Sequence, residues 1–202
     1  MPGHEAEVTG FLRHSVLGSA LLEGVVTTCV GRRLGRHQHE HIVATNWRDE
    51  GAYRHGTDPH GLPVHISPEA DLLSDRRSSA FRVAASTGRG WEGARILRIY
   101  RASIAAESVP VWEQRAMEPL TPLSIKDGLF SVLAGVRVPS VASSGRVSVI
   151  AVSAWRDWDA VLAATGGHID RLVQETELTS LEQPIAVDHY QLLARDMGTV
   201  AD

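Results

Sequence analysis

Three histidines alternate along one expected strand. His37, His39 and His41 are two residues apart, so in an extended chain their side chains share a face and are separated by about 7 Å at each step. Three imidazoles on one face could bind one metal ion. No cysteine or carboxylate cluster accompanies them, and the alternative is a polar strand edge or a cavity wall. We therefore expect no metal and no cofactor.

Other residues with chemical potential occur twice. Trp47-Arg48-Asp49 returns as Trp155-Arg156-Asp157, and His60 returns as His168, at one offset of 108 residues (155 − 47 and 168 − 60). A tryptophan at a strand end either belongs to the core or forms a pocket wall that stacks on a flat ligand and donates a hydrogen bond. A histidine after an amphipathic helix either offsets the helix dipole or serves as a haem ligand or proton shuttle.

The upstream sequence repeats as well. Gly24-Val25-Val26 matches Gly128-Leu129-Phe130 at an offset of 104 residues, so the second copy would have a hairpin loop four residues longer. Loops tolerate such a change in length and strands do not. The pattern predicts two copies of one fold unit, at residues 1–88 and 93–202, joined near Thr87–Gly90.

Further candidates lie on the strands that open and close the second copy. One face of the opening strand should meet a ligand or a structural acid through Arg98 or Arg101. In the closing strand, His189 and Tyr190 must lie on opposite faces, so only one of them can face a ligand. Which one does so is left open by the sequence.

The composition narrows the class of protein. The chain has 202 residues, 43% of them apolar and 22% charged, with a formal net charge of −4. These values are ordinary for a globular protein and give no basic footprint for nucleic acid. A single cysteine, Cys29, permits no intrachain disulfide. There is no apolar run of membrane-spanning length and no signal-peptide pattern, so we expect a cytoplasmic protein that binds neither membrane nor nucleic acid.

Apolar periodicity and turn residues predict an element order of βαββαβ in the second copy. There we expect strands at 94–104, 129–138, 146–155 and 185–193, with helices from 107 to about 123 and at 158–174. In the first copy we expect helices at 5–22 and 49–57 and strands at 24–34, 38–47 and 79–86. The first copy thus lacks the opening strand. The βαββαβ order is that of the ferredoxin-like fold, an antiparallel sheet with both helices on one face.

Taken together, these motifs resemble the antibiotic biosynthesis monooxygenase (ABM) type of dimeric α+β barrel. The resemblance rests on an apolar strand ending in Trp155-Arg156-Asp157, on His168, and on the closing segment Val187–Tyr190, and it extends to the first copy through Ile42–Asp49 and His60. It implies an α+β fold in which two tandem ferredoxin-like repeats form the barrel within one chain. It also implies a ligand cavity between the sheet and the helices of each unit.

The resemblance leaves three functions open. The first is a cofactor-independent monooxygenase of an aromatic, polyketide-like substrate, the second a non-catalytic module that binds a ligand or partner, and the third a haem-binding or haem-degrading protein. We expect a small aromatic or apolar ligand, and a homodimer is possible. The predicted catalytic residues are His168, Trp155 and Tyr190, and the predicted substrate-binding residues are Arg98, Arg101, His189, Trp47 and His60.

Overall fold

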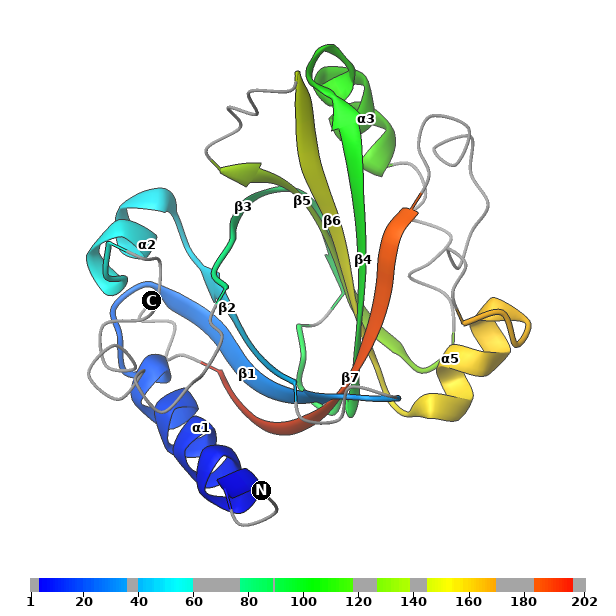
Figure 1. Ribbon diagram of the computed structural model, residues 1–202. Helices are drawn as coiled ribbons and strands as arrows, with labels where there is room; N and C mark the ends of the chain where they lie inside the picture. Colours follow the sequence, from blue (N-terminus) through cyan, green and yellow to red (C-terminus); the bar gives the residue numbers. More distant parts are fainter. Residues whose placement is uncertain are drawn as a thin grey trace. The chain divides into compact units, whose positions relative to one another are not determined.

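The fold is α+β, with an antiparallel sheet and few helices (Figure 1). The structure, a computed structural model, describes residues 4–35, 40–59, 77–88, 90–117, 127–138, 145–169 and 184–197. The elements in chain order are α1 (His4–Ala20), β1 (Val25–Arg33), β2 (His41–Trp47), α2 (Glu50–Gly56), β3 (Ala80–Gly88), β4 (Ile96–Ala105), η2 (Ala106–Ser108), α3 (Val109–Met117), β5 (Leu129–Val138), β6 (Arg146–Trp155), α5 (Trp158–Thr165) and β7 (Pro184–Met197). Each element expected from the sequence is present, most with ends that differ by a few residues and one helix clearly shorter than expected.

The helix expected at 158–174 is shorter than predicted. It ends at Thr165 because Gly166 adopts a left-handed backbone, with φ of 59°, and donates its N–H to the carbonyl of Leu162. Glycine is the residue that most readily takes this conformation, and it is the usual end of a helix. Residues 170–174 lie outside the described residues, as do 118–123 of the other expected helix.

Chain contacts divide the molecule into two compact units. The first unit contains Met1–Ser79 together with Tyr190–Asp202, and the second contains Ala80–His189. In the first unit β1 lies between β2 and the C-terminal part of β7, with antiparallel pairing on both sides. In the second unit the strand order is β7–β4–β6–β5–β3, where β7 contributes its N-terminal part.

The first unit is built around α1. Leu12 and Val16 are one helical turn apart and bury their side chains against Val30 of β1, with Val43 of β2 packed beside them. Ser19 is also buried on this helix, and its hydroxyl donates to the carbonyl of Ser15, 2.9 Å away. This bond satisfies a polar group that burial would otherwise penalise.

The closing strand of each sequence repeat pairs in the other compact unit. β3, at the end of the first repeat, pairs with β5, and the C-terminal part of β7, at the end of the second, pairs with β1. The two pairings are equivalent. Arg33 and Arg137 are 104 residues apart, as the repeat requires, and they lie opposite Tyr190 and Phe81 respectively. Of the predicted repeats at 1–88 and 93–202, the first thus gives β3 to the second unit and the second gives the C-terminal part of β7 to the first unit, and their status as domains stays a prediction.

The two central hairpins share a local irregularity. In the first unit a bulge separates the pair Val25–Trp47 from Thr27–Asn46. In the second unit a bulge separates Leu129–Trp155 from Ser131–Ala154. A bulge bends the strand at one point and is typically conserved among related units. Its recurrence at equivalent positions supports the predicted duplication.

The repeated Arg-Asp pair has the same structural role in both units. The carboxylates of Asp49 and Asp157 each accept the backbone N–H three residues later, at 2.8 Å, and so cap the helices α2 and α5. The preceding Arg48 and Arg156 pair with these carboxylates. The backbone N–H of Arg48 donates to the carbonyl of Gly24, and that of Arg156 donates to the carbonyl of Gly128, both at 2.7 Å. The motif thus fixes the turn from strand to helix.

We expect Asp157→Asn to reduce the acid sensitivity of the protein. The hydrogen bond from Ala160 and the Arg156 guanidinium lower the pKa of Asp157 below 3.8. Its folded form therefore resists protonation more than its unfolded form does. The resulting stability is present above pH 3.8 and is lost as the pH falls through the lowered folded pKa. Asparagine caps about as well but does not titrate.

Thermal melts between about pH 6 and pH 2 measure this effect, with the pH window set by the reference pKa of aspartate. The melting temperature of Asp157→Asn should fall less steeply with acid than that of the wild type. Asp159→Asn, which removes a neighbouring carboxylate that is not the cap, is the matched control. Identical slopes for Asp157→Asn and the wild type would show that the cap carries no pH-dependent stability.

Candidate functional site

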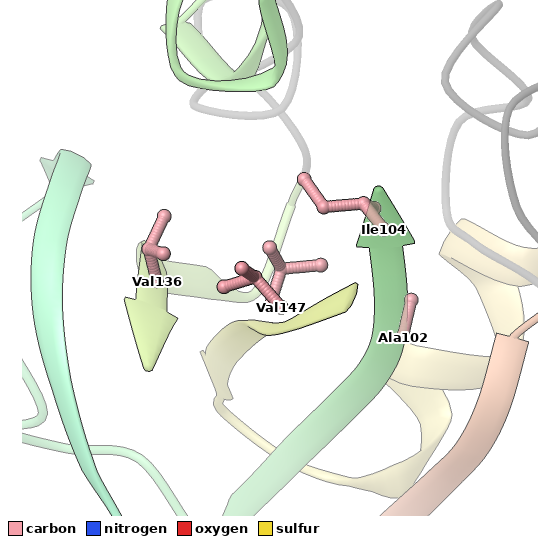
Figure 2. Packing of buried hydrophobic residues seen from close by; sticks show 5 residues of the cluster. Ala102, Ile104, Val136 and Val147 are labelled. Atoms are coloured by element: carbon pink, nitrogen blue, oxygen red, sulfur yellow. The ribbon is translucent and has the colours of Figure 1, made fainter. Parts of the chain in front are cut away.

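The face of the second sheet that meets α3 is filled by apolar side chains. Ala102, Ile104, Val136, Val147 and Val149 form one buried cluster, and Figure 2 shows four of them converging from three strands. A second cluster joins β3 and β5 to α3 and consists of Ala85, Ala116, Val132 and Ala134. Even-numbered residues of β4 and β5 and odd-numbered residues of β6 therefore face the helix. We name this the helix face.

The opposite face of the same sheet, the open face, is lined differently. One row across it consists of Arg101, Ile150, Gly135 and Val83, which lie opposite one another on β4, β6, β5 and β3. Ile150 is only half-buried and Val83 is 44% exposed. The next row contributes Val152 and Leu133, which are also half-buried, and Ile99 of β4, which is buried. Incompletely buried apolar side chains in a row are a surface on which an apolar ligand can lie.

Gly135 lies at the centre of this row, where neighbouring atoms already crowd the position of a Cβ atom. A Cβ atom there would lie 3.2 Å from the Cβ of Phe81 and 3.4 Å from Cγ2 of Ile150. Four strands spaced about 4.8 Å apart give a row about 14 Å long between Arg101 and Val83. A flat molecule of two or three fused rings can fit along such a row.

A single ion pair stands at one end of the row. The Nη1 atom of Arg101 donates to Oδ2 of Asp188 on β7. The Asp188 side chain is 5% exposed, whereas that of Arg101 is 38% exposed. The buried carboxylate therefore orients a guanidinium that still has donors available toward solvent, since a guanidinium carries five. Such a group suits a ligand carboxylate or phenolate.

Arg98 does not join Arg101. It lies on the helix face, is 3% exposed, and donates through Nη2 to the backbone carbonyl of Ile169, at 3.1 Å. Three positions separate the two arginines along β4, so their side chains leave the sheet on opposite sides. Arg98 thus holds the segment that follows α5.

His189 and Tyr190 separate as the alternation of a strand requires. His189 is buried in the second unit, where its ring meets Trp158 of α5 edge-on, with centroids 5.0 Å apart. Tyr190 belongs to the first unit and is 5% exposed. There it packs on β1 at Gly31, where an added Cβ would lie 2.8 Å from the Cβ of Tyr190. Strand alternation leaves His189 facing the helix.

The two repeated tryptophans differ in burial. Trp155 is fully buried, and its indole N–H donates to Oγ of Ser153, at 2.8 Å. Trp47 is half-buried and contacts Tyr53 edge-on, with centroids 6.2 Å apart. Its ring also lies against Gly56, where a Cβ atom would come within 2.2 Å of it. The geometry of Trp155 fits the core alternative that its sequence position left open.

The predicted histidines do not gather with these residues. His168 is exposed beyond the end of α5, and its backbone N–H donates to Thr165. His60, His37 and His39 lie outside the described residues, whereas His41 opens β2 opposite Arg32. Among the residues that the structure describes, no group of three histidine, cysteine, aspartate or glutamate side chains could hold a metal ion.

Sequence reasoning missed Asp188, Trp158 and Gly135. Asp188 shares a segment with His189 that was singled out, but its pairing with Arg101 depends on β7 lying beside β4. Charge complementarity between Arg101 and the only acid in the segment 184–193 could have indicated it. No motif in the sequence singles out Gly135, and its place at the centre of the open face follows from cross-strand pairing.

Comparison with known proteins supports the fold. No model of a protein family matches this sequence, and no curated protein matches it. Among solved structures, an anthrone oxidase-like protein has a TM-score of 0.65 at 12% identity, covering 98% of this chain and 89% of its own. A candidate monooxygenase from Lactobacillus acidophilus has a TM-score of 0.66 at 12% identity, covering 99% and 93%.

A candidate monooxygenase from Fusobacterium nucleatum gives a similar result. Its TM-score is 0.67 at 12% identity, and the match covers 96% of this chain and 88% of the other. The chain therefore shares the fold of these three proteins, and that fold is α+β with an antiparallel sheet, the class that the sequence predicted. At this level of identity the likeness concerns the fold, and function must be argued from the site.

None of the helices in the described part of the chain combines the length and the apolar character needed to cross a membrane.

Proposed function

We propose that the protein binds a flat aromatic molecule on the open face of its second unit and oxidises it as a cofactor-independent monooxygenase. The observation that carries this proposal is the Arg101–Asp188 pair at the end of the apolar row formed by Ile150, Gly135 and Val83. Apolar walls with one oriented polar group are typical of a site for a small ligand. The likeness in fold to an anthrone oxidase-like protein supports the choice of reaction.

The chemistry would depend mainly on the substrate. An anthrone-like CH₂ group loses a proton to give a carbanion conjugated with a phenolate, and this anion reacts with O₂. One oxygen atom replaces the two hydrogens as a carbonyl, and the other leaves as water. Arg101 would stabilise the anion, and Asp188 would hold the guanidinium in place. Catalytic roles for His168, Trp155 and Tyr190 stay predictions, and these residues do not line this row.

Arg101→Gln should weaken binding of an anthrone by about 10-fold to 100-fold, the usual value of a hydrogen bond to a charged group. Fluorescence titration measures the affinity, and oxygen consumption measures turnover. The control is Arg82→Gln, because Arg82 also forms an ion pair, with Glu113, but does so toward α3. Unfolding curves of both variants check that the fold is intact.

The outcomes separate the three functions. Binding and oxygen uptake that both depend on Arg101 support the proposal. Binding that depends on Arg101 without oxygen uptake identifies a ligand-binding module with the proposed site. Equal loss in both variants, or none in either, would remove the site from the open face. A Soret band after titration with haem, with no response to anthrone, would favour the haem alternative.

A further inference from the structure

Burial increases along the open face from one end of the strands to the other. At one end, the Arg101 side chain is 38% exposed and Val83 is 44% exposed. Two rows further along the strands, Leu97 and Ala154 are fully buried and Ser131 is 4% exposed. The open face thus has an exposed end at Arg101 and a buried end at Ser131.

Ser131 supplies a hydroxyl group at the buried end. The register of β5 against β6 is unbroken from Ser131 to Val136, so the Ser131 side chain lies on the same face as Leu133. Its Oγ atom is buried and has no hydrogen-bond partner within the described ranges of the chain. A hydroxyl that is buried without a partner destabilises the fold, so this group requires an explanation.

A bound ligand explains this hydroxyl better than a bound water molecule does. A buried water needs about two to four polar partners. Ala154 and Gly88, which lie opposite Ser131 on β6 and β3, have no hydrogen-bonding atom in their side chains. A flat ligand on the half-buried side chains of Leu133 and Val152 would instead bring its edge to Ser131, and an oxygen on that edge could accept the hydrogen bond.

The separation of Ser131 from Arg101 sets the length of such a ligand. Gly135 lies two strands from Arg101, and Ser131 lies four residues before Gly135 (135 − 131). Strand spacing and rise per residue then place the two Cα atoms about 16 Å apart, along a diagonal of the face. Three linearly fused rings hold oxygens at their two ends about 10 Å apart, and two hydrogen bonds of about 3 Å each extend this to about 16 Å.

We propose that Ser131 donates a hydrogen bond to a second oxygen of the ligand, at the end of the ring system opposite to the anionic group that Arg101 binds. The inference rests on the proposed site on the open face. It narrows the substrate class to elongated aromatic molecules with an oxygen at each end, which lie diagonally across Ile150 and Leu133. Ser131 is then a residue that determines specificity.

The test compares two anthraquinones, which already carry the carbonyl group that the proposed oxidation would form. 2-Hydroxyanthraquinone has a hydroxyl at one end of the ring system, and 2,6-dihydroxyanthraquinone has one at each end. Fluorescence titration measures both affinities, at a pH at which one phenol is ionised. The wild type should bind the dihydroxy compound about 10-fold more tightly, of which a factor of about two arises because this symmetric ligand can bind in two orientations.

Ser131→Ala should reduce this ratio to about two, because only the statistical factor remains. Its affinity for 2-hydroxyanthraquinone should change little. Arg101→Gln should weaken both ligands by the same factor and leave the ratio unchanged. The matched control is Ser148→Ala, a serine of β6 on the far side of the Arg101 row from Ser131. It should leave both affinities unchanged.

The variants distinguish failure of this inference from failure of the proposed function. A ratio that persists in Ser131→Ala, while Arg101→Gln weakens both ligands, would overturn the inference and leave the site in place. Affinities that do not respond to Arg101→Gln would remove the site, and the inference with it. Without ligand, Ser131→Ala should melt no lower than the wild type, because no hydrogen bond is lost. A markedly lower melting temperature would show a structural role for the hydroxyl and contradict the inference.

Discussion

Gly128→Ala is expected to destabilise the protein by about 2–5 kcal/mol. Gly128 has φ of +77°, a conformation that costs an L-residue about 1–2 kcal/mol. An added Cβ would also lie 2.5 Å from the Cβ of Ala160, at the start of α5. Overpacking of this kind typically costs a further 1–3 kcal/mol. Urea unfolding with linear extrapolation measures the change in free energy.

A second substitution separates the two causes. In Gly128→Ala/Ala160→Gly the overlap is removed while the strained backbone remains, so part of the lost stability should return. Gly145→Ala is the matched control, because Gly145 has φ of +68° but open space around its Cβ position. Gly145→Ala should lose only the stability that the strained backbone conformation costs. A Gly128→Ala variant as stable as Gly145→Ala would show that the contact with Ala160 is unimportant.

Trp155→Ala should destabilise the protein by about 3–5 kcal/mol, the usual cost of removing a buried tryptophan side chain. Trp155 is fully buried, and its substitution also removes the donor to Ser153. Trp47→Ala should cost distinctly less, because Trp47 is half-buried and part of its ring surface already meets solvent. Thermal and urea unfolding of the two variants give the comparison.

This difference in stability affects how ligand binding is tested. Loss of binding in Trp155→Ala would follow from unfolding alone, even if Trp155 never touched the ligand. Arg101→Gln is the more informative variant, because the Arg101 side chain is 38% exposed and lies at the end of the apolar row. A Trp155→Ala variant that melts within a degree or two of the wild type would contradict the core assignment and restore Trp155 as a candidate pocket wall.

The sequence was sufficient to predict the elements and their order. Short apolar runs with β-branched residues, such as Arg146–Trp155, and the capping Asp157 are local signals that act over a few residues. The repeat correctly placed Trp47 and Trp155 at the ends of corresponding strands. The exchange of β3 and β7 was not predicted, because strand pairing depends on partners far apart in the chain.

The candidate site was predictable only in part. Alternation along a strand placed His189 and Tyr190 on opposite faces, but the face covered by a helix was decided by the packing of Trp158 on His189. Arg101 was proposed to bind a ligand or an acid, and the structure supplies the acid, Asp188. Arg98 was considered with it, although the three-residue spacing already implied that the two side chains diverge.

The exchange of closing strands bears on how the chain folds as it is synthesised. The first unit requires Tyr190–Met197, the C-terminal part of β7, beside β1. Residues as far as Met197 must therefore leave the ribosome before the first unit can complete its sheet. Until then the edge of β1 stays exposed, and pairing over such sequence separations is slow. Until β7 pairs with it, the unpaired edge of β1 can pair with other chains, so protection of that edge by a chaperone would reduce aggregation.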